Sequence, residues 1–232
     1  MEVLAVPVVL SLALPFGAAA GPSTEVIGRS VQGRPIIAER LGPANAKRTV
    51  LVVGCIHGDE CAALPVLARL RRRPPAGVEL WLVPTLNPDG RAAGTRGNAH
   101  GVDLNRNFPA GWRRIPRSSR YHSGTRPQSE PETRAALGFL RRERPDLSIW
   151  FHQPERNVRD PDGSDSARRY ARLVGLPFMP LPAPPGAATR WQKRGDADAD
   201  AFVVELPAGP LAPPDAARQA RAIRLVAPTA GR

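Results

Sequence analysis

Two histidines and a glutamate are the residues of this 232-residue chain most able to do chemistry together. His57 and Glu60 stand three positions apart, and His152 follows much later in the sequence. Three imidazole and carboxylate ligands with an open fourth position are typical of a catalytic rather than a structural zinc site. The pattern His-x-x-Glu is weak alone, because each histidine could simply be a buried or surface residue. Taken together, the set predicts one zinc ion bound by His57, Glu60 and His152, and hydrolysis as the leading function.

A metal-dependent hydrolase also needs a base that moves a proton from water to the leaving amine. Glu205 lies in the apolar run 202–206. A carboxylate that closes a buried strand is costly unless it faces a site or a partner. We therefore predict that Glu205 is the base. The simpler interpretation is a glutamate that emerges where a strand ends.

Polar residues between positions 96 and 106 could bind a substrate. Arg106 offers a planar fork for a carboxylate, and Asn105 offers one more donor. Asp103 could accept the second ring N–H of a zinc-binding histidine. Arg96 could face the carbonyl oxygen that becomes negative in the transition state.

The elements that must position these residues alternate between strands and helices. Short apolar runs suited to buried strands occur at 50–54, 80–83, 147–151 and 202–206, after an entry hairpin at 25–40. Helical spacing occurs at 62–73, 130–144, 166–174 and 215–225, with Ser129 as a plausible N-cap of the second helix. The pattern predicts an α/β fold with a mixed, largely parallel central sheet and helices on both faces.

The predicted site follows from this topology, because ligands gather outside the carboxyl ends of strands in an open α/β sheet. Two long stretches, 87–129 and 177–198, show no regular pattern. Loops of this length in a compact domain either line a site or are disordered.

Composition sets limits on partners. The net charge is +12, and of the 33 basic residues only Lys47 and Lys193 are lysines. This charge permits long-range attraction to anionic polymers or membranes. No compact basic stripe with interleaved aromatic residues is present, so we expect no binding to nucleic acid.

The N-terminus has the pattern of a secretory signal peptide, with an apolar stretch at 3–16 and small residues at 18–20. We expect cleavage after Ala20, which leaves 21–232 as a single domain with no stable membrane span. The protein would then be secreted or held in the cell envelope. It would be cytoplasmic if residues 1–20 are not a functional signal.

Two cysteines flank the first pair of predicted ligands. Cys55 and Cys61 could form a disulfide that braces the metal-binding turn in an exported protein. They could equally be two free thiols, one on the strand and one on the helix.

Several motifs occur in an order typical of one protein family. They are His57-x-x-Glu60, Asn87-Pro88-Asp89-Gly90, Val102–Phe108, Ser129–Thr133 and His152. Together they resemble the zinc carboxypeptidase (M14) family over residues 25–225. Further matches at 28–36 and 97–103 make the short bacterial murein peptide amidases the most similar subgroup. That subgroup cleaves the γ-D-glutamyl–diaminopimelate bond of cell-wall peptides.

The resemblance implies the same roles that the residue types indicate. His57, Glu60 and His152 match the zinc ligands, and Glu205 matches the general base. Asn105 and Arg106 match the residues that bind the terminal carboxylate of the substrate, and Arg96 matches the oxyanion stabiliser.

The chain also departs from the family pattern. Digestive members carry a substrate-binding tyrosine shortly before the base, but neither Tyr121 nor Tyr170 lies near Glu205 in the sequence. Trp191 is expected to shape the pocket in its place. His100 replaces the asparagine expected before Gly101.

The sequence thus predicts a monomeric zinc metallopeptidase that acts beside a residue with a free carboxylate, with a cell-wall-derived peptide as substrate. Three alternatives remain open. They are a general metallocarboxypeptidase, an aspartoacylase-like zinc deacylase and a non-catalytic wall-binding protein.

Overall fold

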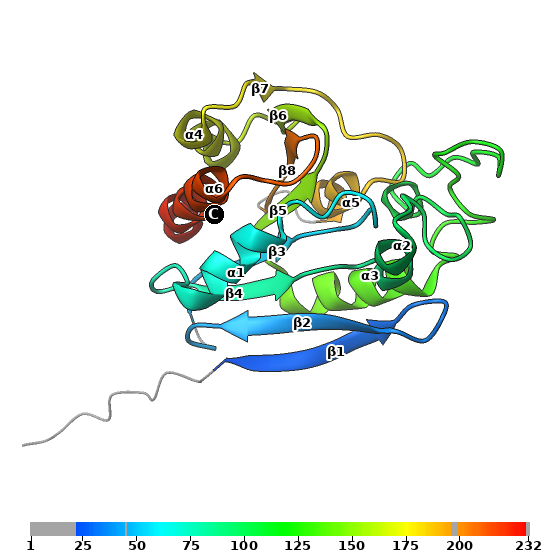
Figure 1. Ribbon diagram of the computed structural model, residues 1–232, viewed down its shortest axis with the longest axis horizontal. Helices are drawn as coiled ribbons and strands as arrows, with labels where there is room; N and C mark the ends of the chain where they lie inside the picture. Colours follow the sequence, from blue (N-terminus) through cyan, green and yellow to red (C-terminus); the bar gives the residue numbers. More distant parts are fainter. Residues whose placement is uncertain (1–21, 45, 196–198, 231–232) are drawn as a thin grey trace, which may run out of the picture.

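The computed structural model describes residues 22–44, 46–195 and 199–230. The predicted signal segment 1–20 lies outside them. The described residues form one eight-stranded sheet in the order β1-β2-β4-β3-β5-β8-β6-β7 (Figure 1). The strands are β1 Ser23–Arg29, β2 Pro35–Leu41, β3 Thr49–Val53, β4 Glu79–Val83, β5 Leu147–His152, β6 Glu155–Arg159, β7 Phe178–Met179 and β8 Asp200–Pro207.

The four central strands, β4, β3, β5 and β8, run parallel. At one side β2 pairs antiparallel with β4, and β1 pairs antiparallel with β2. At the other side β6 pairs antiparallel with β8, and the short β7 runs parallel to β6. The predicted mixed, largely parallel sheet is confirmed.

Side chains of the central strands alternate between two hydrophobic cores, as the two-residue period of a strand requires. Val50 and Val52 enter the first core, whereas Leu51 and Val53 enter the second. Helices α1 Leu64–Arg72, α4 Asp165–Val174 and α6 Pro213–Val226 pack in the first core, and helices α3 Pro131–Glu143 and α5 Ala188–Gly195 pack in the second. The sheet therefore has helices on both faces, as predicted.

The start of α3 corrects one sequence prediction. Ser129 is not the N-cap, because the helix begins at Pro131 and Glu130 occupies the cap position without a side-chain cap bond. The Ser129 hydroxyl instead donates to the Glu130 carboxylate at 2.6 Å. The proline at the first helical position, which is a common start of a helix, is confirmed.

The two stretches without sequence periodicity contain regular structure after all. The first holds α2 Pro88–Ala93 and the 3₁₀ turn Leu104–Arg106, and the second holds β7 and α5. A second 3₁₀ turn, Ala227–Thr229, follows α6. Among the described residues, no helix is long and apolar enough to cross a membrane.

Candidate active site

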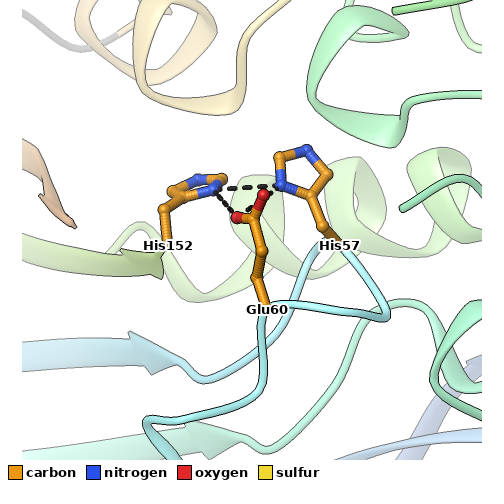
Figure 2. Close-up of side chains that lie close together, drawn as sticks. All are labelled: His57, Glu60 and His152. Carbon is orange, nitrogen blue, oxygen red and sulfur yellow. Dashed lines mark hydrogen bonds and ion pairs between the residues drawn. The ribbon is translucent and has the colours of Figure 1, made fainter. Parts of the chain in front are cut away.

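The three predicted metal ligands meet at the carboxyl end of the central strands (Figure 2). His57 and Glu60 lie in the loop between β3 and α1, and His152 is the last residue of β5. Because β3 and β5 are hydrogen-bonded neighbours, chain segments far apart in sequence end side by side. All three side chains are buried.

The donor atoms of this cluster have the spacing that a tetrahedral ion needs. Glu60 Oε2 lies 2.8 Å from His57 Nδ1 and 3.0 Å from His152 Nδ1, and the two Nδ1 atoms are 3.2 Å apart. Zn–N and Zn–O bonds of about 2.0–2.1 Å place tetrahedral ligands roughly 3.3 Å from one another. Two imidazoles and one carboxylate also form a ligand set of the catalytic type. The residues therefore fit a zinc ion.

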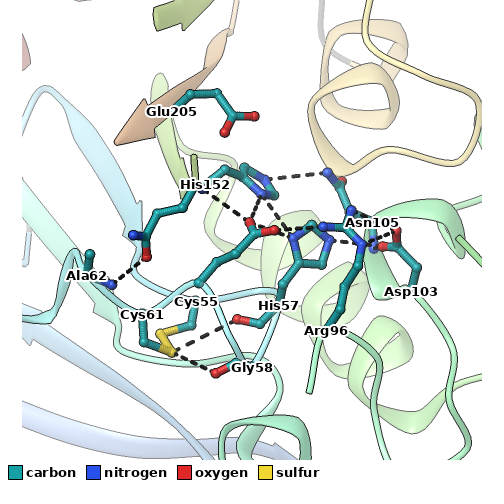
Figure 3. Close-up of polar contacts among 12 residues, drawn as sticks. Cys55, His57, Gly58, Cys61, Ala62, Arg96, Asp103, Asn105, His152 and Glu205 are labelled. Atoms are coloured by element: carbon teal, nitrogen blue, oxygen red, sulfur yellow. Dashed lines mark hydrogen bonds and ion pairs between the residues drawn. A yellow bond between two sulfur atoms is a disulfide. The ribbon is translucent and has the colours of Figure 1, made fainter. Parts of the chain in front are cut away.

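Second contacts hold the two imidazole rings with Nδ1 directed at the cluster (Figure 3). Asp103 Oδ1 lies 3.0 Å from His57 Nε2, as the sequence predicted. Asn105 Nδ2 lies 3.4 Å from His152 Nε2. The carboxylate of Asp103 thus fixes the His57 tautomer that leaves Nδ1 free for a metal.

Charge in the cluster suits a cation. Burial would raise the pKa of Glu60, but hydrogen bonds and charge from both histidines hold that pKa well below its usual range. Burial lowers the pKa of His152 to about 4. Burial also opposes the charged form of His57, yet the Asp103 and Glu60 carboxylates raise its pKa above the ordinary value. An ionised Glu60 and a neutral His152 are the forms that bind metal.

A disulfide closes the loop that carries two of the three ligands. Cys55 and Cys61 are bonded, with Cα atoms 5.0 Å apart, so the structure has the disulfide rather than the two free thiols.

A glutamine next to His152 connects this loop to two strands. Gln153 Oε1 accepts from the backbone N–H of Ala62 at 3.1 Å, and its Nε2 donates to the Pro207 carbonyl at 2.8 Å.

Glu205 faces the same space from β8 (Figure 3). It is paired in register with His152 on the neighbouring parallel strand. Its Oε2 is buried and makes no hydrogen bond with any described residue. Burial raises the pKa of Glu205, whereas the guanidinium of Arg159, 3.8 Å from Oε1, lowers it. An unpartnered buried carboxylate oxygen is the feature expected of a group that acts on a ligand.

Arg96 lies on the other side of the ligands from Glu205 (Figure 3), and Arg106 lines the same pocket. Arg96 Nη1 contacts Glu60 Oε1 at 2.7 Å, and Arg96 Nη2 contacts Asp103 Oδ2 at 2.9 Å. Both Arg96 and Arg106 stack over the ring of Tyr121, with guanidinium carbons 5.2 and 5.3 Å from its centre. The structure thus brings these arginines to the cluster and adds a tyrosine that the sequence did not suggest.

One pocket of about 570 Å³ collects these groups. Of the predicted residues, all except the fully buried Asp103 line it: His57, Glu60, Arg96, Asn105, Arg106, His152 and Glu205. Sequence reasoning missed Tyr121, Arg159 and Thr189, which also line it. Arg159 lies on β6, which follows the His152 strand directly in the sequence. This short separation from a predicted ligand is the signal that could have found it.

Trp191 corrects another expectation. It does not line the pocket but packs against the second core and lies under the guanidinium of Arg141, 5.5 Å from its ring centre. The pocket does contain a tyrosine, Tyr121, which comes from a loop far from Glu205 in the sequence.

Comparisons with known proteins agree with this geometry. The family model for zinc carboxypeptidases matches residues 76–169. Murein peptide amidase A of Escherichia coli strain K12 is 36% identical over 171 residues, which cover 68% of this chain and 70% of that protein. Carboxypeptidase SOL1 of Arabidopsis thaliana is 33% identical over 162 residues, covering 62% of this chain and 32% of that protein.

Solved structures show the same fold. The crystal structure of a murein-tripeptide amidase from Escherichia coli O157 has a TM-score of 0.70 and 31% identity, and the match covers 89% of this chain and 92% of that one. The crystal structure of a carboxypeptidase A from Helicoverpa armigera has a TM-score of 0.77 at 19% identity, covering 89% and 68% of the two chains.

Proposed function

The chain belongs to the zinc carboxypeptidase family, and from this premise we propose that it hydrolyses the γ-D-glutamyl–diaminopimelate bond of murein peptides in a zinc-dependent reaction. One observation carries the chemistry. Three donor atoms converge within 4.8 Å of one another, and the unpartnered carboxylate oxygen of Glu205 faces the same pocket.

The His57, Glu60 and His152 side chains would hold the zinc ion. When bound, zinc polarises the scissile carbonyl group and makes water a stronger acid. Glu205 takes a proton from the attacking water and hands it to the leaving amine. Its raised pKa supports this role, because a base with a pKa closer to neutrality can both accept and release the proton.

The substrate would be held by its free carboxylate. Asn105 and Arg106 bind that carboxylate, with Arg106 supported on the ring of Tyr121. Arg96, held by Glu60 and Asp103, stabilises the carbonyl oxygen as negative charge develops there. Asp103 orients His57 and, through it, the zinc site.

The choice of a murein peptide is supported by the names of two relatives. The Escherichia coli protein with 36% identity is called a murein peptide amidase, and the matching crystal structure is called a murein-tripeptide amidase. Three other functions remain to be distinguished: a general metallocarboxypeptidase, an aspartoacylase-like deacylase and a non-catalytic wall-binding protein.

A panel of substrates separates these functions. Purified protein, with zinc present or chelated, is incubated with L-Ala-γ-D-Glu-diaminopimelate, with ordinary C-terminal peptides and with N-acyl amino acids, and products are identified by mass spectrometry. We expect zinc-dependent release of diaminopimelate from the tripeptide. Preferred cleavage of ordinary peptides or of acyl amino acids would contradict the proposed substrate. Binding without any hydrolysis would favour the wall-binding protein.

We propose that the protein works as a monomer outside the cytoplasm, after removal of residues 1–20. The apolar stretch 3–16 followed by small residues at 18–20 supports export. Mass spectrometry of the intact protein from the periplasm or medium of an expressing bacterium should give a mature chain that begins at Gly21. An uncleaved chain retained in the cytoplasm would contradict export.

A further inference from the structure

A pair of opposite charges lies on the pocket wall beside the proposed base. Strand β6 runs antiparallel to β8, with Asn157 opposite Glu205 and Arg159 opposite Val203. Residues opposite one another on paired strands project to the same face of a sheet. Glu155, two positions before Asn157, projects to that face too, so Glu155 and Arg159 both point toward the pocket that they line.

The contacts of Arg159 hold its guanidinium in one orientation. Its Nε donates to Asn157 Oδ1 at 3.0 Å, and its Nη1 lies 3.8 Å from Glu205 Oε1. Its Nη2 forms an ion pair with the carboxylate of Glu155. The Glu155 side chain is 52% exposed and that of Arg159 is 28% exposed. A positive and a negative group therefore stand side by side, each still accessible to a ligand.

The proposed function fixes which part of a substrate reaches this pair. The scissile bond lies at the zinc ligands and Glu205, and the terminal carboxylate lies at Asn105 and Arg106. The rest of the pocket is lined by residues 181–184 and 187, Thr189 of α5, Val203, residues 208–209 and the β6 wall, and the charged side chains of this part are Glu155 and Arg159. The side chain of the residue after the scissile bond therefore extends toward Arg159, which is within 4 Å of the base.

We infer that Arg159 and Glu155 together select a side chain that ends in an amino-acid group. Arg159 binds the distal carboxylate of that group as a planar fork, and Glu155 binds its distal ammonium. Diaminopimelate has such an end, since one carbon at the distal end of its side chain carries both an ammonium group and a carboxylate group. A side chain with one charge leaves either Arg159 or Glu155 facing an uncharged group, which lowers its affinity relative to the zwitterion. This inference rests on the proposed function.

The test crosses three substrates with two variants. The substrates are L-Ala-γ-D-Glu joined to diaminopimelate, to diaminopimelate amidated at its side-chain carboxylate, and to L-lysine. The variants are Arg159→Gln and Glu155→Gln. Arg156→Gln is the matched control, because Arg156 is an exposed arginine of the same strand outside the pocket. Values of kcat/KM are compared at a pH on the plateau of each profile.

We expect Arg159→Gln to lower kcat/KM about tenfold for the substrate with the free distal carboxylate and to change the other two little. Glu155→Gln should lower kcat/KM for all three, because each keeps a distal ammonium group. Arg156→Gln should resemble the wild type.

An equal loss on all three substrates in Arg159→Gln would overturn the inference, because it would mean that Arg159 acts through Glu205. Equal wild-type activity on lysine and diaminopimelate would overturn it as well. If the wild type cleaves none of the three substrates, the proposed function itself fails. If the Arg159→Gln protein does not fold, Arg159→Lys is used in its place. This variant keeps the positive charge but loses the planar fork, so we expect the preference for the free distal carboxylate to fall only in part.

Discussion

At the scale of single residues, the site depends on groups that hold other groups in place. His57 Nδ1 points at the other ligands because Asp103 occupies its Nε2 side at 3.0 Å. The same Asp103 carboxylate contacts Arg96 through two nitrogens, so it also positions the predicted oxyanion stabiliser. A fully buried carboxylate with these partners contributes to metal affinity without touching the metal.

Replacing Asp103 tests this support. We expect Asp103→Ala to weaken zinc binding by about 10- to 100-fold, because the ring of His57 loses the acceptor that orients it. Zinc affinity is measured by competition with a chromogenic chelator. Asp215→Ala is the control, since Asp215 pairs with Arg218 on the exposed surface of α6. Unchanged zinc affinity in Asp103→Ala would contradict the role given to this residue.

The pH dependence of the reaction reports on Glu205. The base works only when ionised, so kcat/KM falls as the pH drops through its pKa. Burial and the negative charge of Glu60 raise that pKa, while Arg159, His57 and Arg96 lower it. The acid limb should therefore lie above the ordinary glutamate value of 4.5.

Removing the positive charge at position 159 raises the pKa of Glu205 further. The acid limb of the Arg159→Gln profile should thus move to higher pH than that of the wild type, for every substrate. A limb that stays in place or moves to lower pH would show that Arg159 does not influence the base. The profiles are recorded as kcat/KM against pH on one substrate.

At the scale of elements, the four central strands and helices α1, α3, α4 and α6 could be predicted, whereas β6, β7 and α5 could not. Residues 50–53 show the uninterrupted apolar run of a strand buried on both faces, and the structure divides these side chains between two cores. Strand β6, with the sequence Glu-Arg-Asn-Val-Arg, has no such run, because one face lines a polar pocket. Helix α5 was missed for a related reason, since its sequence is mostly polar and only part of it is buried.

Residues of the motifs that resemble the family are hydrogen-bonded to one another. Asp89 accepts hydrogen bonds from the Ser30 hydroxyl at 2.8 Å and from the Gln32 backbone at 3.0 Å. Glu132 accepts from the Val31 backbone and from Asn98, both at 3.0 Å. These contacts join the β1–β2 turn to α2 and α3. No pattern within a single motif could reveal them, because each partner lies far away in the sequence.

The contribution of the disulfide can be tested directly. It closes the loop that carries His57 and Glu60, and a closed loop restrains the unfolded chain by on the order of 2 kcal/mol. We expect the double variant Cys55→Ser/Cys61→Ser to have a lower Tm and weaker zinc affinity than the wild type. Unchanged values of both, measured by calorimetry and chelator competition, would mean that the surrounding contacts alone hold the loop.

At the scale of the whole molecule, the parallel centre of the sheet explains why residues from four distant segments meet. The loop after β3, the end of β5 and the end of β8 open at one edge, as the rule for α/β sheets predicted. The segment around residues 103–121 then covers this edge and supplies Asp103, Asn105, Arg106 and Tyr121. The sequence indicated the edge, but only tertiary contacts determine how that long segment lies over it.

Zinc should stabilise the entire fold, because its ligands come from two strand ends that exist together only in the native state. A ligand that binds the native state alone adds about 2.7 kcal/mol at a concentration a hundredfold above its Kd. We therefore expect Tm to fall on chelation and to rise again on adding zinc. A Tm independent of zinc would contradict a site formed by His57, Glu60 and His152.

The most direct test of the central claim is the rate of diaminopimelate release from L-Ala-γ-D-Glu-diaminopimelate, measured together with bound zinc for the wild type and Glu205→Gln. We predict zinc-dependent release by the wild type, and for Glu205→Gln about one zinc per chain with release lowered by roughly 100- to 10,000-fold. Release by Glu205→Gln at the wild-type rate, or release by wild type that persists after complete removal of zinc, would contradict the account.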